Sequence, residues 1–405
     1  MTTKITEQNV SNLANFGVQW QAIHVADGST ALTVSAGKGY FIDTTSATQT
    51  VNLPANASST AGDTIILKDY ARKWATNKVT IASNTFDGVT NAPEFNTKGQ
   101  TVTLVHMGTT KGWSLINEDT TTGLGAQYVA ATGGTVTTSG SIKIHSFTGD
   151  SNFVVSSAGN SEGANKLDYL VVAGGGGAND TGGGGAGGMR FSAGSETGPY
   201  PLGGSGGTAL TAAAQTYPIT VGGGGNHGGQ GSNSVFSTIT SAGGGAGAHG
   251  GGGQPGGSGG GAGYNSGTGG TGNTPPVSPP QGNNGGNAPA VQGSPFRGAG
   301  GGGAGQAGGN QPGGNGGNGL VNSVTGSPVT YAGGGGGAGT SGAGGNGGCG
   351  GGGASGSHPS QDGVNGEAGT ANRGSGGGSA SGLPSRGTGG AGGKGIVVIR
   401  YQFQE

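Results

Sequence analysis

Few side chains of this chain are suited to chemistry. Its 405 residues include 17 acidic and 16 basic residues, six histidines and one cysteine. Zinc and similar metals are held by closely spaced His and Cys ligands. The histidines show no such spacing; they are His24, His106, His145, His227, His249 and His358. We therefore expect no metal site, and the single cysteine, Cys349, cannot form an intrachain disulfide.

The sequence also gives little support for glycan hydrolysis or for nucleotide binding. Glycan cleavage needs two carboxylates about 5 to 10 Å apart, but the acidic residues fall at expected turns and strand ends or stand isolated in the sequence. Residues 170–173 precede the glycines 174–177, as a strand precedes a dinucleotide-binding loop. In that motif, however, a helix must begin directly after the loop. Residues 178–182 (ANDTG) cannot start a sustained helix. We expect neither an enzyme nor a bound cofactor.

The composition is dominated by glycine. Glycine accounts for 106 of the 405 residues, against an average of about 7%. Of these, 89 lie within 174–395, a region with only nine Asp, Glu, Lys or Arg residues. The net charge is -1 with no Lys/Arg cluster, which argues against nucleic acid as a partner. No apolar run reaches the length of a transmembrane helix, so no membrane insertion is expected either.

The first 122 residues have the pattern of ordinary β protein. We divide them into an arm, 1–30, packed on a neighbour, and a β-rich module, 31–122. Runs rich in Thr, Val and Ile recur about every ten positions, as in small all-β units; the expected strands are 39–43, 50–54, 62–69, 78–81, 101–106 and 112–116. Because so small a module is marginally stable alone, we expect a homo-oligomer and favour a trimer.

A second β region, 123–173, directly precedes the glycines. Its last expected strand, 166–173, has a counterpart beyond the glycine region in the apolar segment 395–401 (GIVVIRY). We predict that these flanking strands belong to one β unit that holds both ends of 174–395. The C-terminal strand is assigned to 396–405, and the fold class is mostly β plus irregular structure.

Two alternative structures can be considered for the glycine-rich region. Such composition without a strict period usually indicates disorder. Here, however, glycine occurs in blocks that alternate with segments of different composition, such as 273–280 and 320–331. We favour a lattice of left-handed glycine helices with three residues per turn, similar to polyproline II. Since glycine keeps its N–H, neighbouring helices can pair their backbone groups, and the intervening segments become loops at the ends of the lattice.

Four motifs carry a family resemblance. They are 169–177 (YLVVAGGGG), 216–225 (TYPITVGGGG), 234–236 with 242–245 (SVF and AGGG), and 393–401 (GKGIVVIRY). In this order they resemble the glycine-rich domain of bacteriophage tail fibre and receptor-recognition proteins, over about residues 125–405. The similarity to the distal tail fibre adhesins of T-even-like phages is looser. In those adhesins, polyglycine-II-type helices form a layered lattice whose end loops contact host outer-membrane proteins.

The resemblance implies a receptor-binding protein located in the virion, on a tail fibre or another surface appendage. Its expected partners are a host surface receptor, either an outer-membrane protein or a surface glycan, and other virion proteins. Aromatic and arginine side chains in loops are the usual energetic anchors of binding. The receptor-binding candidates, chosen from the inserted segments, are Met189, Arg190, Phe191, Tyr200, Tyr264, Val277, Phe296, Arg297, Arg373, Leu383 and Arg386.

Other interpretations remain open at this stage. The protein could be a purely structural virion fibre or decoration subunit that uses the glycine lattice as a rigid spacer. The aromatic residues Phe191, Tyr217, Phe236 and Tyr331 could instead pack against the lattice flank, and we favour this for Tyr217 and Phe236, which lie in β-like runs. The order of the glycine blocks does not tell which loops lie at the exposed end.

Overall fold

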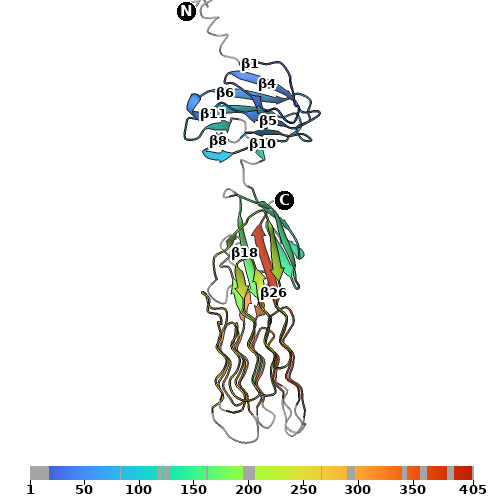
Figure 1. Cartoon of the computed structure of the whole chain (residues 1–405), viewed down its shortest axis with the longest axis vertical. Helices are drawn as coiled ribbons and strands as arrows, with labels where there is room; N and C mark the ends of the chain where they lie inside the picture. The colour runs from blue at the N-terminus through green and yellow to red at the C-terminus, as the bar shows by residue number, and fades with distance from the viewer. Residues whose placement is uncertain are drawn as a thin grey trace, which may run out of the picture. The chain divides into compact units, whose positions relative to one another are not determined.

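The protein consists of β-strands, glycine runs and irregular segments (Figure 1). The computed structural model describes residues 18–82, 84–116, 121–122, 127–160, 163–194, 206–265, 267–289, 297–339, 344–355, 363–380 and 387–403. These residues contain no α-helix and one short 3-10 turn, Asn56–Ser58. The mostly β fold class is therefore confirmed. The chain divides into two compact units, Met1–Ala126 and Gln127–Glu405.

The first unit contains two sheets. The larger has the order β1-β4-β6-β11-β12-β8-β9, with β2 also paired to β4. Its strands are β1 (Gln19–Trp20), β2 (His24–Val25), β4 (Lys38–Asp43), β6 (Thr64–Asp69), β8 (Asn84–Phe86), β9 (Val89–Asn91), β11 (Thr101–His106) and β12 (Trp113–Leu115). The smaller has the order β13-β10-β7-β5-β3; its strands are β3 (Leu32–Thr33), β5 (Gln49–Asn52), β7 (Val79–Ile81), β10 (Glu94–Phe95) and β13 (Thr121–Thr122).

Apolar and polar residues alternate along the strands of this unit, and the apolar side chains form its core. Every second residue of β6 and β11 is buried, because successive side chains of a strand point to opposite faces. Trp74 and Trp113 are fully buried in the same core. Within the expected arm, 1–30, strands β1 and β2 both pair in parallel with β4 and so extend the larger sheet.

The second unit also begins with two sheets. One has the order β14-β17-β21-β22-β23, and the other β15-β16-β26-β18-β19, with β20 also paired to β18. The strands are β14 (Val129–Thr132), β15 (Thr135–Ser139), β16 (Ile142–Phe147), β17 (Ser151–Ala158), β18 (Lys166–Val172), β19 (Met189–Phe191), β20 (Leu210–Thr211), β21 (Thr216–Thr220), β22 (Ser234–Phe236), β23 (Ile239–Ser241) and β26 (Ile396–Gln402). A separate hairpin joins β24 (Leu320–Asn322) to β25 (Val329–Tyr331).

Strands β18 and β26 pair antiparallel from Asp168 opposite Arg400 to Val172 opposite Ile396. The predicted pairing of the two strands that flank the glycine region is thus present. Both faces of β18 are covered: Tyr169 and Val171 pack in one cluster, which includes the buried Tyr217 and Phe236. Leu170 and Val172 pack in another, on the opposite face. Burial on both faces explains why the strand is a continuous apolar run rather than an alternating one.

Beyond these strands the glycine runs pair through their backbones. The N–H groups of run 182–188 donate to three different neighbours, at N···O distances of 2.8 to 3.0 Å. Every third residue points to the same neighbour, so that 182, 185 and 188 donate to run 242–248, 183 and 186 to run 299–302, and 184 and 187 to run 374–377. This period is that of a helix with three residues per turn.

The carbonyl groups of the same run are paired with a second set of neighbours. Runs 173–179, 258–261 and 335–338 donate to carbonyls between Thr181 and Gly188, at 2.8 to 3.1 Å. The central run is therefore surrounded by six others, three that accept from it and three that donate to it. Pairing on all sides removes most of the cost of burying backbone polar groups.

The runs approach too closely for most side chains. A Cβ on Gly183, Gly184 or Gly185 would lie 2.2, 2.1 or 2.3 Å from a carbonyl oxygen of a neighbouring run. None of the residues 182–188 has a positive φ. Glycine is required here by space rather than by backbone conformation.

The runs define two ends of the lattice. At the strand end they join β-strands such as β18 and β26, from which they extend in Figure 1. At the far end they reverse direction, in described turns at 179–181, 226–229 and 249–252. Segment 273–281 is a turn at the strand end, since Gln281 O accepts from the N–H of Met189 in β19.

The buried side chain of His145 connects the turn between β14 and β15 to strand β26. His145 Nδ1 lies 2.7 Å from Gly133 O and Nε2 lies 3.0 Å from the Tyr401 hydroxyl. Burial lowers the pKa of His145, and the charge of Lys143 lowers it further, against the opposing hydrogen bond to Gly133. Burial also raises the pKa of Tyr401 to about 12. A neutral imidazole satisfies both contacts, with Nδ1–H donating to Gly133 O and Nε2 accepting from Tyr401.

We expect Gly184→Ala and Gly223→Ala to differ sharply. The Cβ at 184 meets backbone oxygen at 2.1 Å, whereas nothing lies within 4 Å of a Cβ at 223. The first substitution should destabilise the second unit by about 3 kcal/mol or more, and the second should change stability by less than about 1 kcal/mol. Urea unfolding of the two variants tests this. If the two variants were equally stable, the close packing of the glycine runs around Gly184 would be wrong.

Acid should destabilise the second unit through His145. Because its folded pKa lies below the usual 6.5, the unfolded state binds more protons as pH falls below that value, and stability falls with it. The slope contributed is up to about 1.4 kcal/mol per pH unit. Urea unfolding between pH 8 and 5 should show a shallower dependence for His145→Phe than for the wild type. His227→Gln, at a partly exposed histidine, is the control; equal slopes for all three proteins would contradict the argument.

Candidate functional site

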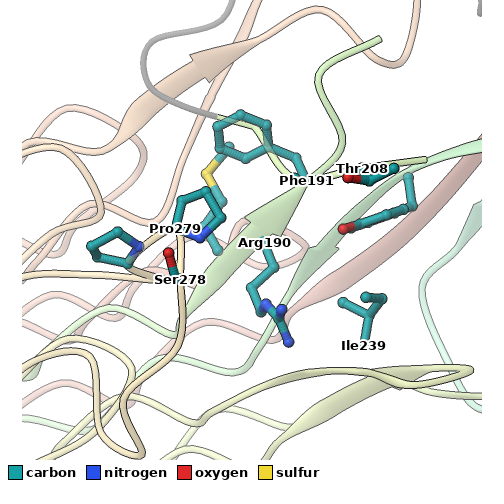
Figure 2. Close-up of a pocket in the computed structure, with 10 residues that line it drawn as sticks. Arg190, Phe191, Thr208, Ile239, Ser278 and Pro279 are labelled. Carbon is teal, nitrogen blue, oxygen red and sulfur yellow. The ribbon is translucent and has the colours of Figure 1, made fainter. Parts of the chain in front are cut away.

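A pocket lies at the strand end of the second unit (Figure 2). Its volume is about 240 Å³. Strand β18 contributes Tyr169, β19 contributes three residues and β23 contributes Ile239. The complete lining is Tyr169, Met189, Arg190, Phe191, Gly207, Thr208, Ile239, Ser278, Pro279 and Pro280. The pocket therefore joins residues that are far apart in the sequence.

Arg190 supplies the charge of this pocket. Strand β19 buries Met189 and Phe191 and leaves Arg190 half-buried between them. Figure 2 shows the Arg190 side chain between Ile239 on one side and Ser278 and Pro279 on the other. Its guanidinium makes one long hydrogen bond, 3.3 Å from Nη1 to Thr240 O. The other four N–H donors of the guanidinium make no hydrogen bond to a described residue and can donate to a ligand.

Tyr169 is a buried residue that brings a hydroxyl to the pocket lining. Only 3% of the residue is exposed, and its hydroxyl makes no hydrogen bond to any described residue. Burial raises the pKa of Tyr169, while the nearby charge of Arg190 opposes that shift. The tyrosine is therefore neutral and can both donate and accept one hydrogen bond.

Segment 273–281 positions the proline side of the pocket. Asn273 has a φ of 50°, and its side chain bonds to both the N–H and the carbonyl of Val277, at 3.1 Å each. Gln281 is 1% exposed; its amide donates to Pro275 O and accepts from the N–H of Ala242. Side-chain bonds at both ends of the turn hold Ser278, Pro279 and Pro280 in place.

A second group of side chains lies at the far end. Asp180 accepts from two histidines, with Oδ1 3.0 Å from His227 Nε2 and Oδ2 3.1 Å from His249 Nδ1. The His249 ring also meets the Tyr264 ring edge-on, with centroids 5.2 Å apart. These residues come from separate turns, which the lattice brings together. The histidine side chains are 39% and 34% exposed, so this group is accessible to a partner.

An uncharged depression of about 530 Å³ lies among other residues of the lattice. It is lined by Gly267, Thr268, Asn287, Ala288, Pro289, Asn310 and Gln311. Arg297 is held beside it, because its carbonyl accepts from the Gln311 side chain at 3.2 Å. Amide and hydroxyl groups can hydrogen-bond to a polar partner without a charge.

The structure separates the receptor-binding candidates into several groups. Met189 and Phe191 are 2% and 6% exposed and pack in the core, so they cannot serve as projecting surface anchors. Arg190 lines the pocket, and Val277 lies in the strand-end turn beside it. Tyr264 is at the far end. Arg373 is at the strand end, where its Nη1 donates to Thr330 O at 3.0 Å. Tyr200, Phe296, Leu383 and Arg386 lie outside the described residues.

Sequence reasoning missed several residues of both groups. Tyr169 is expected only as part of the strand 166–173, and nothing in the sequence singles out Ile239. Asp180 was considered only as a possible catalytic carboxylate. Its two histidine partners are too distant in the sequence for any spacing to reveal the contact.

Two features are absent from the described residues. No group of three or more His, Cys, Asp or Glu side chains is arranged to hold a metal ion within these ranges. No helix among the same residues has the length and hydropathy of a membrane span.

Comparison with known proteins assigns the second unit to a family. No curated protein matches the chain. A family model described as a glycine-rich domain matches residues 150–402. The match begins just before β17, ends with β26 and includes the glycine runs between them. Since it covers well over half of the sequence, the chain belongs to the glycine-rich domain family.

Proposed function

We propose that this protein is a bacteriophage tail fibre or receptor-binding protein. The first unit attaches it to other virion proteins, as a homo-oligomer for which we favour a trimer. The second unit presents turns of the glycine lattice to a host surface receptor, either an outer-membrane protein or a glycan. In this proposal it is a virion protein that binds rather than an enzyme. The order of the four sequence motifs supports the phage assignment.

One structural observation supports the binding role most directly. Run 182–188 contains only glycine and alanine, whereas the far-end turns contain Asp, His and Tyr side chains. Each turn is anchored by two runs that are paired along their length with neighbouring runs. A rigid support lowers the ordering cost of binding, because the contact residues are already in position.

The far-end group has the composition of a recognition surface. Arg297 also lies near this end, because the N–H of the next residue, Gly298, donates to Ala338 O and Ala338 donates to Thr181 O in the turn 179–181. Tyr264 and Arg297 are partly exposed, and tyrosine and arginine are frequent among residues that dominate binding energy. The contact between Asp180 and the two histidines fixes the turns relative to one another. A partner would thus meet several turns as one surface.

Binding of the labelled full-length protein to host cells tests the proposal. We expect saturable binding that competes with adsorption of intact virus. The double variant Tyr264→Ala, Arg297→Ala should bind at least about tenfold more weakly, because two anchors are lost. The control is Arg373→Ala at the strand end, which should bind like the wild type.

Thermal unfolding must first show that each variant is folded. If the folded wild-type protein neither binds cells nor competes with virus, the receptor-binding role is wrong and the structural fibre becomes the better interpretation. If the double variant binds unchanged, the far-end turns are not the contact surface.

A further inference from the structure

The strand-end pocket has no part in the proposed function. Receptor binding is assigned to the far-end turns, whereas the pocket is formed by β18, β19, β23 and segment 273–281.

The polar groups of the pocket are incompletely paired. Tyr169 lines the pocket, and its hydroxyl makes no hydrogen bond to any described residue, so that it can bond to a ligand. Thr208 and Ser278 add exposed hydroxyls to the lining. Three hydroxyls around one small space complement a ligand that itself carries several hydroxyl groups.

The charge of the lining is positive. Arg190 is its one ionisable cation, and the lining contains no Asp or Glu. The nearest carboxylate along β18, Asp168, is fully buried and accepts from Ser192 Oγ at 2.7 Å. Arginine pairs with a carboxylate through two parallel hydrogen bonds, and Arg190 has the donors for this.

The apolar part of the lining comes from β19, β23 and segment 273–281. It consists of Met189, Phe191, Ile239, Pro279 and Pro280. Ile239 and Pro279 lie on opposite sides of Arg190 (Figure 2). The volume of about 240 Å³ is below that of sites for drug-sized ligands, which begin near ~300 Å³. It suits a single ring with one C–H face.

We infer that this pocket binds one carboxylated sugar unit. Arg190 pairs with the carboxylate, the hydroxyls of Tyr169, Thr208 and Ser278 bond to the sugar hydroxyls, and Ile239 contacts the C–H face. The unit could be a free sugar acid or the end of a surface glycan, since both present the same groups.

Calorimetric titration of the full-length protein tests the inference. D-glucuronate should bind, neutral D-glucose should bind at least about tenfold more weakly because it lacks the charge, and acetate should not bind measurably. Methyl β-D-glucuronide distinguishes the two sources: tighter binding than free glucuronate indicates a glycan end, and weaker binding indicates the free acid.

Matched variants locate the site. Arg190→Gln should weaken glucuronate binding at least about tenfold, and Tyr169→Phe, which removes only a hydroxyl, by about three- to tenfold. Arg373→Gln is the control, because this arginine also donates to a strand carbonyl but lies outside the pocket. Its affinity should equal that of the wild type.

Three results would overturn the inference. They are no binding of either glucuronate or its methyl glycoside, equal binding of glucose and glucuronate, and binding of acetate or inorganic phosphate as tight as that of glucuronate, which would indicate a simple anion site. Unchanged affinity in folded Arg190→Gln would likewise place the ligand elsewhere. None of these results bears on the adsorption experiment, so this inference and the proposed function can fail separately.

Discussion

Backbone hydrogen bonding between glycine runs is the interaction on which the second unit depends. Ordering a glycine costs more conformational entropy than ordering any other residue, and a run of glycines has no side chains to bury in return. The six-neighbour arrangement around 182–188 offsets this cost, because N–H and carbonyl groups along the run are paired with adjacent runs. The same arrangement leaves no space for a Cβ at positions such as Gly184. The composition of the chain thus follows from its hydrogen bonding.

This constraint also explains the β-strands and the turns. A glycine lattice has little apolar surface of its own, so the apolar strands β18 and β26 supply a core at one end and fix the two ends of the region by pairing with each other. Side chains with functional groups are restricted to the borders of the lattice. The Asp180 group at the far end and the pocket around Arg190 at the strand end occupy two such borders.

The sequence predicted what depends on local pattern. Alternation in 101–106 matches β11 residue for residue, and the apolar segments 166–173 and 395–401 differ from β18 and β26 by a single residue at the ends. The buried positions of Tyr217 and Phe236 were also expected. Contacts between distant segments could not be predicted, because they depend on the path that the glycine runs take through the lattice. Nothing in the spacing places segment 273–281 at the strand end or brings Asp180 to His249, and Met189 and Phe191 looked like loop residues because the short strand β19 follows a glycine block.

The hydrogen bonds between the glycine runs should make them open together with the β-sheets rather than behave as a flexible chain. Hydrogen exchange of the full-length protein, followed by mass spectrometry, measures this. We expect amides in 182–188 to exchange as slowly as those of Lys166–Val172 in β18, because both are released only when the whole unit unfolds. Exchange of 182–188 at the rate of an unstructured glycine chain, while β18 remains protected, would contradict it.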